Sequence, residues 1–374
     1  MSALDTRLAL SLAAFTAAWI ALGLAALRRV VRPTEAPSPR PPPVTVLKPL
    51  AGADARLADN LLSFFQQDHP DFELLFGCED PGDPSLAVVA ALIAAHPGVR
   101  ARVVVHAGPR GGNPKVRNLR GIIDLARHDL VLVSDSNVWA PPGYLREAAA
   151  LWGGDVGLVT HLFVGVPGRR APLAAWVEAL LLADFCAPGA ALPTALGHAA
   201  VIGKSMLFSR AELASFGGLG RVADVMAEDY VLGRMFQLRG RRVRMGATVI
   251  ENTLGAVTWR SLFDRHLRWS MLRLRLHPHL WFLEPCTSPL VVAAALGLVL
   301  GPAGVLAGAA LMVTRDVVSW TLLRGPRELW APLALGLLRE AVMVAVWVVT
   351  PWKRHVRWRG HKMRLESGTL LYDA

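Results

Sequence analysis

The chain has 374 residues, 53% of them hydrophobic, and its mean hydropathy of +0.37 indicates that part of it belongs in a bilayer. Its formal net charge of +11 suits anionic lipid or phosphorylated substrates, and the sequence has no recognisable nucleic-acid-binding module, so we expect no nucleic acid partner. Its three cysteines are far apart and lack zinc-binding spacing, which excludes a disulfide framework.

The first element is an uncharged apolar run over Leu8–Leu27, which is long enough to cross a bilayer as a helix. Arg28 and two further arginines follow this run, whereas a signal peptide carries its basic residues before the apolar run. The positive-inside rule then places the amino terminus outside and the next domain in the cytoplasm. We predict a transmembrane helix over residues 1–30 and an extended, proline-rich linker over residues 31–43.

Residues 44–255 alternate short apolar runs with helical stretches, which is typical of βα units around a mainly parallel sheet. The expected strands are Val44–Leu50, Phe72–Cys78, Arg102–Val105 and Leu130–Ser134, and the expected helices are Asp59–Gln67, Ser85–Ala95, Lys115–Ala126 and Gly143–Leu151. The sequence contains neither a GxGxxG nor a P-loop motif, which disfavours dinucleotide-binding and ATP-hydrolysing proteins. We therefore predict a Rossmann-like α/β domain.

Acidic residues recur where this sheet should expose the carboxyl ends of its strands, the edge at which such sheets bind ligands. Asp80 follows the second strand, Asp135 follows the fourth, and Glu228 and Asp229 precede a helix expected over Tyr230–Leu238. Carboxylates that converge on one edge repel unless a cation, hydrogen-bond donors or protonation relieve them. Because Mg²⁺ and Mn²⁺ prefer hard oxygen ligands, either metal fits here with a diphosphate, although each acid alone is a common turn or cap residue.

Two helices with an apolar face are expected further along the chain. The face of Pro172–Phe185 suits either the protein core or a helix that dips into lipid, and the sequence leaves both open. Trp259–Leu276 carries Arg265 and Arg268 on one face, with Trp269 one turn from Arg265. Paired guanidinium groups match the oxygens of a diphosphate. A helix at the bilayer surface with its arginines toward headgroups is the alternative, and the two interpretations are compatible.

The rest of the chain is expected at the membrane. The predicted segments are an amphipathic interfacial segment over residues 256–285, transmembrane helices over residues 286–350 and a basic cytoplasmic tail over residues 351–374. The two candidate spans are Pro289–Val313, where the Gly301-Pro302 pair kinks the helix or turns it back, and Ala331–Thr350. Arg339 and Glu340 lie inside the second span and are expected to face protein rather than lipid.

These residues together resemble a known family. In chain order, Asp80, Asp135, Asp229 and the segment Arg265–Trp269 resemble the D, D, D, (Q/R)xxRW signature of membrane glycosyltransferases with a GT-A fold. Four segments are more narrowly similar to ceramide glucosyltransferases and their bacterial relatives that act on hopanoids: Val44–Leu50, Glu79–Pro84, Asn113–Leu119 and Ala227–Tyr230. The resemblance spans nearly the whole chain and implies a GT-A domain over residues 44–255.

The resemblance implies an inverting transfer of a sugar, glucose first, from a UDP-sugar to the hydroxyl of a membrane lipid, with ceramide as the leading acceptor. Asp229 is then the general base, and Asp135 holds Mg²⁺ or Mn²⁺ at the sugar diphosphate. The residues implied to bind the nucleotide sugar are Asp80, Glu79, Lys48, Lys115, Asn118 and Asp135, and those implied at the diphosphate and acceptor are Arg265, Arg268, Trp269 and Glu228.

One position departs from the wider superfamily, whose members carry Asp-x-Asp at the metal site, because the second position here is Asn137. An amide offers only a neutral oxygen, so the metal would depend mainly on Asp135 and the diphosphate and would bind weakly without nucleotide. We interpret His198 as a structural histidine rather than a substrate contact. Lys204 is expected to contact either phosphate or solvent.

Other functions remain open to test. A bacterial relative with similar motifs transfers N-acetylglucosamine to a hopanoid polyol, which changes the sugar and acceptor but not the chemistry. A processive polysaccharide synthase is disfavoured because the trailing apolar segments are too few for a secretion channel, and a non-catalytic membrane scaffold is disfavoured by the intact acids. The implied location is a bacterial inner membrane with the catalytic domain in the cytoplasm, and the sequence does not indicate the oligomeric state.

Overall fold

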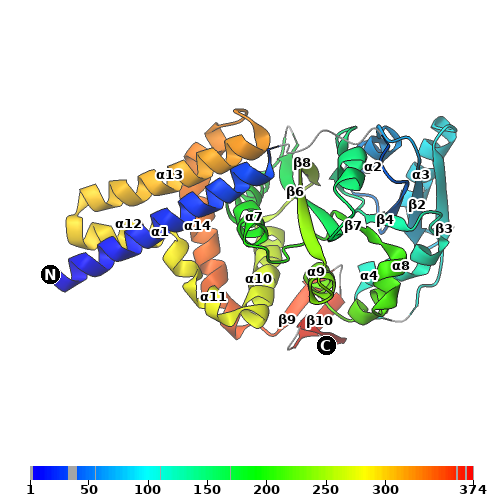
Figure 1. Ribbon diagram of the computed structural model, residues 1–374. Helices are drawn as coiled ribbons and strands as arrows, with labels where there is room; N and C mark the ends of the chain where they lie inside the picture. The colour runs from blue at the N-terminus through cyan, green and yellow to red at the C-terminus, as the bar shows by residue number, and fades with distance from the viewer. Residues whose placement is uncertain are drawn as a thin grey trace.

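The computed structural model describes residues 3–32, 40–54, 56–109, 111–168, 170–358, 361–366 and 369–373. Most of the predicted proline-rich linker therefore lies outside the described residues. The strands of the main sheet are β1 (Val44–Pro49), β2 (Phe72–Cys78), β3 (Arg100–Val105), β4 (Leu130–Val133), β5 (Val138–Trp139), β6 (Val156–Pro167), β7 (Met206–Ser209) and β8 (Arg242–Leu254). This sheet is the centre of an α/β domain. Long apolar helices extend from one side of that domain (Figure 1).

The eight strands form one sheet in the order β3-β2-β1-β4-β7-β6-β8-β5. Strands β3, β2, β1 and β4 are parallel to one another, β7 is antiparallel to both its neighbours, and β6 pairs in parallel with β8. The prediction of a mainly parallel α/β sheet is thus confirmed. Leu47 of β1 pairs with Val133 of β4, and Pro49 pairs with Gly77 of β2, so these three strands end at one edge.

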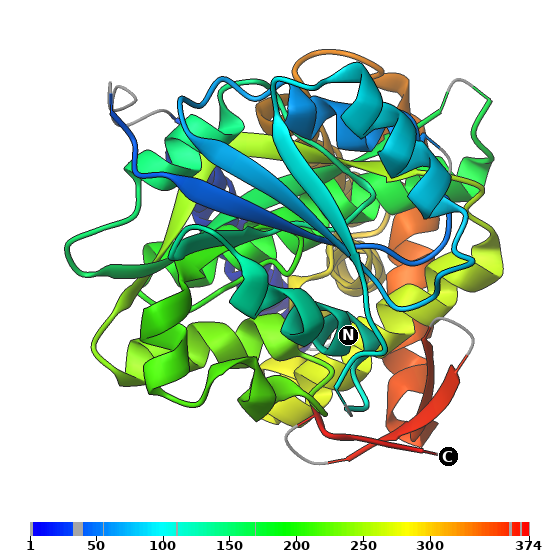
Figure 2. The same ribbon diagram turned by 90° about the vertical axis from the view of Figure 1, so that its right-hand side faces the viewer.

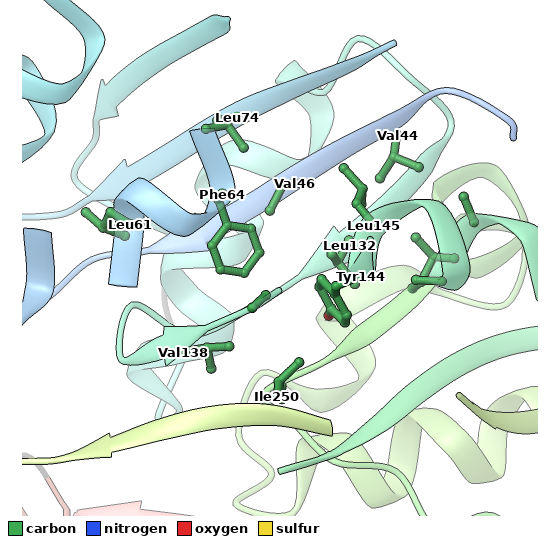
Figure 3. Close-up of a cluster of buried hydrophobic side chains, with 14 of the residues drawn as sticks. Val44, Val46, Leu61, Phe64, Leu74, Leu132, Val138, Tyr144, Leu145 and Ile250 are labelled. Carbon is green, nitrogen blue, oxygen red and sulfur yellow. The ribbon is translucent and has the colours of Figure 1, made fainter. Parts of the chain in front are cut away.

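Helices cover both faces of the sheet, as a turned view shows (Figure 2). The helices of this domain are α2 (Leu57–Phe65), α3 (Ser85–Ala95), α4 (Pro114–Ile122), α5 (Tyr144–Ala150), α8 (Arg210–Ser215) and α9 (Glu228–Leu238). Alternate residues of β1 point to opposite faces. Val46 packs in the cluster with Phe64 and Tyr144 (Figure 3), and Leu47 packs on the other face in a cluster with Val116. Both faces of the central strands are therefore buried.

The remaining helices lie on the side of the α/β domain away from β3 and α3 (Figure 1). They are α1 (Ala3–Val30), α6 (Leu173–Leu181), a π-helical turn (Leu182–Cys186), α7 (Ala187–Ala195), α10 (Trp259–Leu276), α11 (Pro278–Leu283), α12 (Pro289–Leu300), α13 (Pro302–Arg324) and α14 (Trp330–Val349). Among the described residues, four helical stretches are long and apolar enough to cross a membrane: Leu4–Val30, Leu173–Ala195, Pro302–Arg324 and Trp330–Trp352. The bent pair Pro278–Thr287 and Pro289–Leu300 would make a fifth.

Of the two alternatives for Gly301-Pro302, a kink or a turn back, the structure shows the turn back: α12 ends at Leu300 and α13 begins at Pro302. Gly301 has φ +61°, a conformation that favours glycine, and Pro302 begins the next helix. Helix α13 then runs back along α12, so closely that a Cβ on Gly308 would lie 2.4 Å from Cβ of Ala293. The Gly-Pro pair marked the break, but because both helices are apolar on every side, the sequence pattern did not distinguish a kink from a turn back.

The stretch Leu173–Ala195 begins and ends at the main sheet. It follows β6 and leads to β7, and these strands are hydrogen-bonded neighbours in which Thr160 pairs with Met206. A full crossing by this helix would require the loop after it to return through lipid without helical hydrogen bonds, which a bilayer disfavours. We conclude that α6 and α7 do not cross the membrane but pack at the side of the α/β domain, α7 against α1 and α6 against α14.

Buried charges connect these helices to one another. We call this group the helix-bundle charge cluster, and its members are Asp184, Arg315, Asp316, Arg339 and Glu340. Arg339 Nη2 lies 2.6 Å from Asp184 Oδ1, and Arg315 Nη1 donates to Glu340 Oε1 at 2.7 Å. Arg339 and Glu340 are 3% and 1% exposed, which confirms that they face protein. The π-helical turn that carries Asp184 is therefore joined to α13 and α14 by ion pairs.

The basic tail contains a small antiparallel sheet of β9 (His355–Trp358), β10 (His361–Leu365) and β11 (Leu371–Asp373). Its buried residues share one cluster with the segment before α9 and with α10: Met226, Leu267, Met271, Val356, Met363, Leu365 and Leu371. The amide of Met226 also donates to the carbonyl of Thr369 at 2.9 Å. The tail thus packs beside the start of α9 and the arginine-bearing helix.

Candidate active site

Asp135 lies at the carboxyl end of β4 between two lysines. Lys115 Nζ is 3.1 Å from its Oδ1, and Lys204 Nζ is 3.1 Å from its Oδ2. Burial alone would raise the pKa of Asp135, but the two ammonium charges outweigh burial and hold that pKa well below its usual range. Asp135 is therefore a permanent carboxylate at the sheet edge.

Lys115 joins three separate parts of the chain. Its position follows from the start of α4, where the side chain of Asn113 accepts hydrogen bonds from two backbone amides and Pro114 occupies the first turn. Its Nζ lies 3.2 Å from Glu228 Oε1 and donates to the carbonyl of Gly203 at 2.6 Å. Burial disfavours the ammonium ion, yet Asp135 and Glu228 more than compensate and raise the pKa of Lys115. Lys115 is the electrostatic centre of the site.

Glu228 and Asp229 begin α9, where the positive end of the helix favours carboxylates. Asp229 Oδ2 accepts a hydrogen bond from the amide of Gly203 at 2.9 Å, and its Oδ1 accepts from the amide of Tyr230 at 2.8 Å. Burial raises the pKa of Glu228 to about 7 and also raises that of Asp229. A carboxylate with a raised pKa is a stronger base, as general base catalysis at neutral pH requires.

The turn over residues 202–205 connects Lys115 with Asp229. The sequence pattern did not predict this turn as part of the site. The backbone of Gly203 contacts Lys115 through its carbonyl and Asp229 through its amide. A Cβ on this glycine would lie 3.0 Å from Asp229 Oδ2 and 3.1 Å from Lys115 Nζ, so the close approach requires glycine. Lys204 points to Asp135 and does not simply face solvent. The feature of the sequence that could have indicated this turn is the triplet Gly203-Lys204-Ser205.

We call these residues the sheet-edge charge cluster, and its members are Lys115, Asp135, Lys204, Glu228 and Asp229. Both arginines of the RxxRW segment act on it electrostatically. The charge of Arg265 contributes to lowering the pKa of Lys204, and burial followed by Arg265 lowers the pKa of Arg268 to about 10. Glu228 partly offsets this shift in Arg268. Arg265 thus acts electrostatically on Lys204, and Glu228 acts on Arg268.

Trp269 lies beside this edge on the membrane side. Its half-buried ring packs against the apolar cluster that contains α6 and α14, and it makes an edge contact with His266 at 5.2 Å between ring centroids. The ring therefore lies between the arginines and the helices that could contact lipid.

Asp80 lies on the same edge but away from the cluster. It follows β2, which is separated from β4 by β1, so at about 4.8 Å per strand the two strand ends lie about 10 Å apart. The side chain is exposed and accepts a hydrogen bond from the amide of Gly82 at 2.8 Å. Glu79 differs, because its carboxylate forms a two-pronged ion pair with Arg117 at 2.6–3.0 Å. Its charge is thus already balanced.

Lys48 and Asn118 hold the strand ends in place and do not point outward. Lys48 is 0% exposed, and its Nζ donates to Ser134 Oγ at 3.1 Å and to the carbonyl of Asp135 at 2.9 Å. Asn118 Nδ2 donates to the carbonyls of Leu50 and Gly77 at 3.2 and 3.0 Å. In this structure these two side chains, and that of Glu79, contact other parts of the chain at the edge. Their contacts with the nucleotide stay a prediction.

The position of the Lys204 ammonium group shows where a divalent cation could bind near Asp135. Its ammonium group contacts Asp135 Oδ2 at 3.1 Å and Asn137 Oδ1 at 2.7 Å, so two hard oxygens converge on one cationic position. Within the described ranges, no three His, Cys, Asp or Glu side chains are grouped closely enough to hold an ion by themselves. The residues therefore fit a Mg²⁺ or Mn²⁺ ion that takes its other ligands from a diphosphate.

A family model described as glycosyl transferase family 21 matches residues 8–371. The chain belongs to glycosyl transferase family 21. Two relatives extend the match over most of the chain. Ceramide glucosyltransferase 1 of Caenorhabditis elegans is 28% identical over 343 residues, covering 89% of this chain and 73% of the relative. Ceramide glucosyltransferase 3 of the same organism is 26% identical over 340 residues, covering 87% and 73%.

A shorter match to the ceramide glucosyltransferase of Komagataella phaffii is 38% identical over 112 residues, which is 28% of this chain and 21% of that protein. The structure of this family 21 member is similar to the mannosyltransferase PcManGT from Pyrobaculum calidifontis, solved in complex with GDP-Man and Mn²⁺. The TM-score is 0.51 at 20% identity, and the alignment covers 93% of this chain and 99% of that one. The predicted resemblance and the GT-A-like fold are thus confirmed, and this family 21 protein is a glycosyltransferase.

Proposed function

We propose that this glycosyltransferase transfers a sugar, glucose first, from a UDP-sugar to the hydroxyl of a membrane lipid, with ceramide as the leading acceptor. The observation that carries the proposal is the sheet-edge charge cluster, in which Lys115 pairs with Asp135 and Glu228, and the backbone of Gly203 contacts both Lys115 and Asp229. The family match supports the sugar and the acceptor, because two relatives that match over 343 and 340 residues are ceramide glucosyltransferases.

Asp229 is the general base in this proposal. It removes the proton from the lipid hydroxyl while that oxygen attacks the anomeric carbon, and the bond from this carbon to UDP breaks in the same in-line step. One displacement inverts the anomeric configuration. The amide of Gly203 fixes one carboxylate oxygen of Asp229, which orients the base before the acceptor binds.

The departing UDP develops negative charge, and basic residues are placed to stabilise it. Lys204, Arg265 and Arg268 are the candidates, because their charges act on one another at the same edge. Asp135 and Asn137 would hold Mg²⁺ or Mn²⁺, which when bound supplies further positive charge at the diphosphate. Asp80, at the outer end of β2, is proposed to contact the uridine.

The acceptor is proposed to enter from the membrane side, past Trp269. This ring packs against the cluster of α6 and α14, whereas its helix carries the two arginines. We further propose that the domain lies at the cytoplasmic face of a bacterial inner membrane, since arginines follow the apolar residues of α1 on the domain side. The oligomeric state is not part of this proposal.

Purified protein incubated with a panel of UDP-sugars and lipid acceptors tests the proposal by mass spectrometry of the lipid products. The expected product is a hexosylated ceramide formed from UDP-glucose in the presence of Mg²⁺ or Mn²⁺. N-acetylglucosaminyl hopanoid as the sole product would keep the chemistry and replace the sugar and acceptor. The absence of UDP release with every lipid would refute the proposed function.

A further inference from the structure

Glu178 is a fully buried carboxylate outside the sheet-edge charge cluster. It lies on α6 at 0% exposure, in a helix whose other side chains near it are apolar. Its Oε1 accepts a hydrogen bond from Arg265 Nη1 at 2.7 Å, and its Oε2 lies 3.2 Å from His266 Nε2. Both oxygens thus contact neighbouring residues of the RxxRW helix. A buried carboxylate is costly unless it is paired in this way, so the position is built around these two partners.

Arg265 needs such a partner because other cations surround it. Its charge acts on Lys204 and on Arg268, so like charges repel in this part of the site. An arginine side chain also has many rotamers, and an unpaired one would turn away from its like-charged neighbours. Glu178 fixes one end of the guanidinium plane, and the side chain of Arg265 stays 32% exposed. The planar fork can therefore donate to Glu178 and to a phosphate oxygen together.

The second contact of Glu178, with His266, holds a further residue of α10 in place. His266 is 1% exposed and lies between Glu178 and the ring of Trp269, which it meets edge to face. One carboxylate thus sets the orientation of the first arginine directly and supports the tryptophan through His266.

Helix α6 is itself anchored on its other side. The π-helical turn that continues it carries Asp184, which accepts from Arg339 Nε and Nη2 at 2.9 and 2.6 Å. Glu178 therefore projects from a helix that is held by the helix-bundle charge cluster. This anchoring gives its carboxylate a fixed place from which to orient Arg265.

We propose that Glu178 is a positioning residue that holds Arg265 in the orientation required to bind the diphosphate of the donor. The proposal rests on the proposed function, because it assigns Arg265 to the departing nucleotide. Its consequence is that the charge of Glu178, on a helix facing the membrane side, contributes to binding the nucleotide at the sheet edge.

The test is UDP binding by calorimetry, with turnover, for Glu178→Gln and a matched control on the same helix. Glu284 accepts from Arg273 Nη2 of α10 at 3.1 Å, so Glu284→Gln also removes a carboxylate partner of an α10 arginine. We expect Glu178→Gln to weaken UDP binding by about tenfold, the effect of one lost charge-assisted hydrogen bond, and Glu284→Gln to leave it within about twofold. Glu178→Asp, which keeps the charge, should recover part of the loss.

A double-mutant cycle with Arg265→Gln separates positioning from a general loss of folding. If Glu178 acts through Arg265, the double variant binds UDP as weakly as Arg265→Gln alone. Additive losses would overturn the proposal, as would an unchanged UDP affinity in folded Glu178→Gln. If Glu178→Gln does not fold, unchanged UDP affinity in Arg265→Gln, whose side chain is partly exposed, would overturn it equally. Wild-type protein that binds no UDP would instead refute the proposed function.

Discussion

The molecule contains two charge clusters of similar composition, and they differ in what surrounds them. The sheet-edge charge cluster has three carboxylates and two lysines, and the helix-bundle charge cluster has three carboxylates and two arginines. Asp135 in the first retains 27% exposure, whereas Asp184 in the second has 0%. Burial alone therefore does not mark a functional site. A binding site needs charged groups that a ligand can reach, and a structural cluster satisfies its charges internally.

The two clusters also differ in the elements that carry them. The sheet-edge residues lie in turns and helix starts, where backbone amides and glycine allow close approach. The helix-bundle residues lie inside apolar helices, where Arg315 pairs with Glu340 and Arg339 pairs with Asp184 on another helix. Substitutions in the sheet-edge charge cluster should therefore lower turnover and leave the free energy of unfolding nearly unchanged. Substitutions in the helix-bundle charge cluster should mainly lower the free energy of unfolding.

The largest catalytic effect is expected from Asp229→Asn. Loss of the general base should lower the turnover number by about a thousandfold while UDP affinity stays within about twofold. The measurement is steady-state turnover with calorimetric UDP binding on the same preparation. Turnover close to wild type would remove Asp229 from its proposed role, and a large loss of thermal stability would erase the contrast between the clusters.

Arg339→Ala tests the other side of the comparison. It leaves Asp184 and Glu340 without one cation each, and a broken buried ion pair costs about 3–5 kcal/mol of unfolding free energy. Thermal unfolding in lipid nanodiscs measures this effect. Arg354→Ala, at an exposed position before β9, is the control and should leave the midpoint unchanged. An equally stable Arg339→Ala protein would show that the helix-bundle cluster does not hold the helices together.

Gly203→Ala should affect the site through one added methyl group. Contacts of 3.0 and 3.1 Å to Asp229 and Lys115 would force both groups to move, and a displacement of this kind lowers turnover by about tenfold or more. Gly220→Ala adds a methyl group that meets no atom within 4 Å, so turnover should not change. Equal activity in the two variants would contradict the role of the turn over residues 202–205.

The pH dependence gives the smallest expected effect. Glu228 has a pKa of about 7, so it loses its charge as the pH falls through that value and its ion pair with Lys115 weakens. We expect kcat/KM to rise with pH through an apparent midpoint near 7, and Glu228→Gln to move that midpoint to lower pH. A profile with the same midpoint in the variant would assign the titration to another group.

Much of the fold follows from local patterns. Continuous apolar runs predict β1, β2 and β4 to within two residues, and the Asn113-Pro114 pair predicts a helix start. The strands β6, β7 and β8 were not predicted, because their register depends on neighbours distant in the chain. The contacts that Lys48, Glu79 and Asn118 make within the chain were not predicted either, since sequence does not show which partner a polar side chain will choose.

Local spacing along the chain was enough to predict that acids follow the strands, that two arginines share a helix face and that apolar helices flank the domain. The pairing of Lys115 with both Asp135 and Glu228, which are 93 residues apart, and of Glu178 with Arg265 is visible only once the chain is folded. Such pairings depend on the order of strands in the sheet and on helix packing, and a buried charge takes whichever partner that arrangement brings within reach.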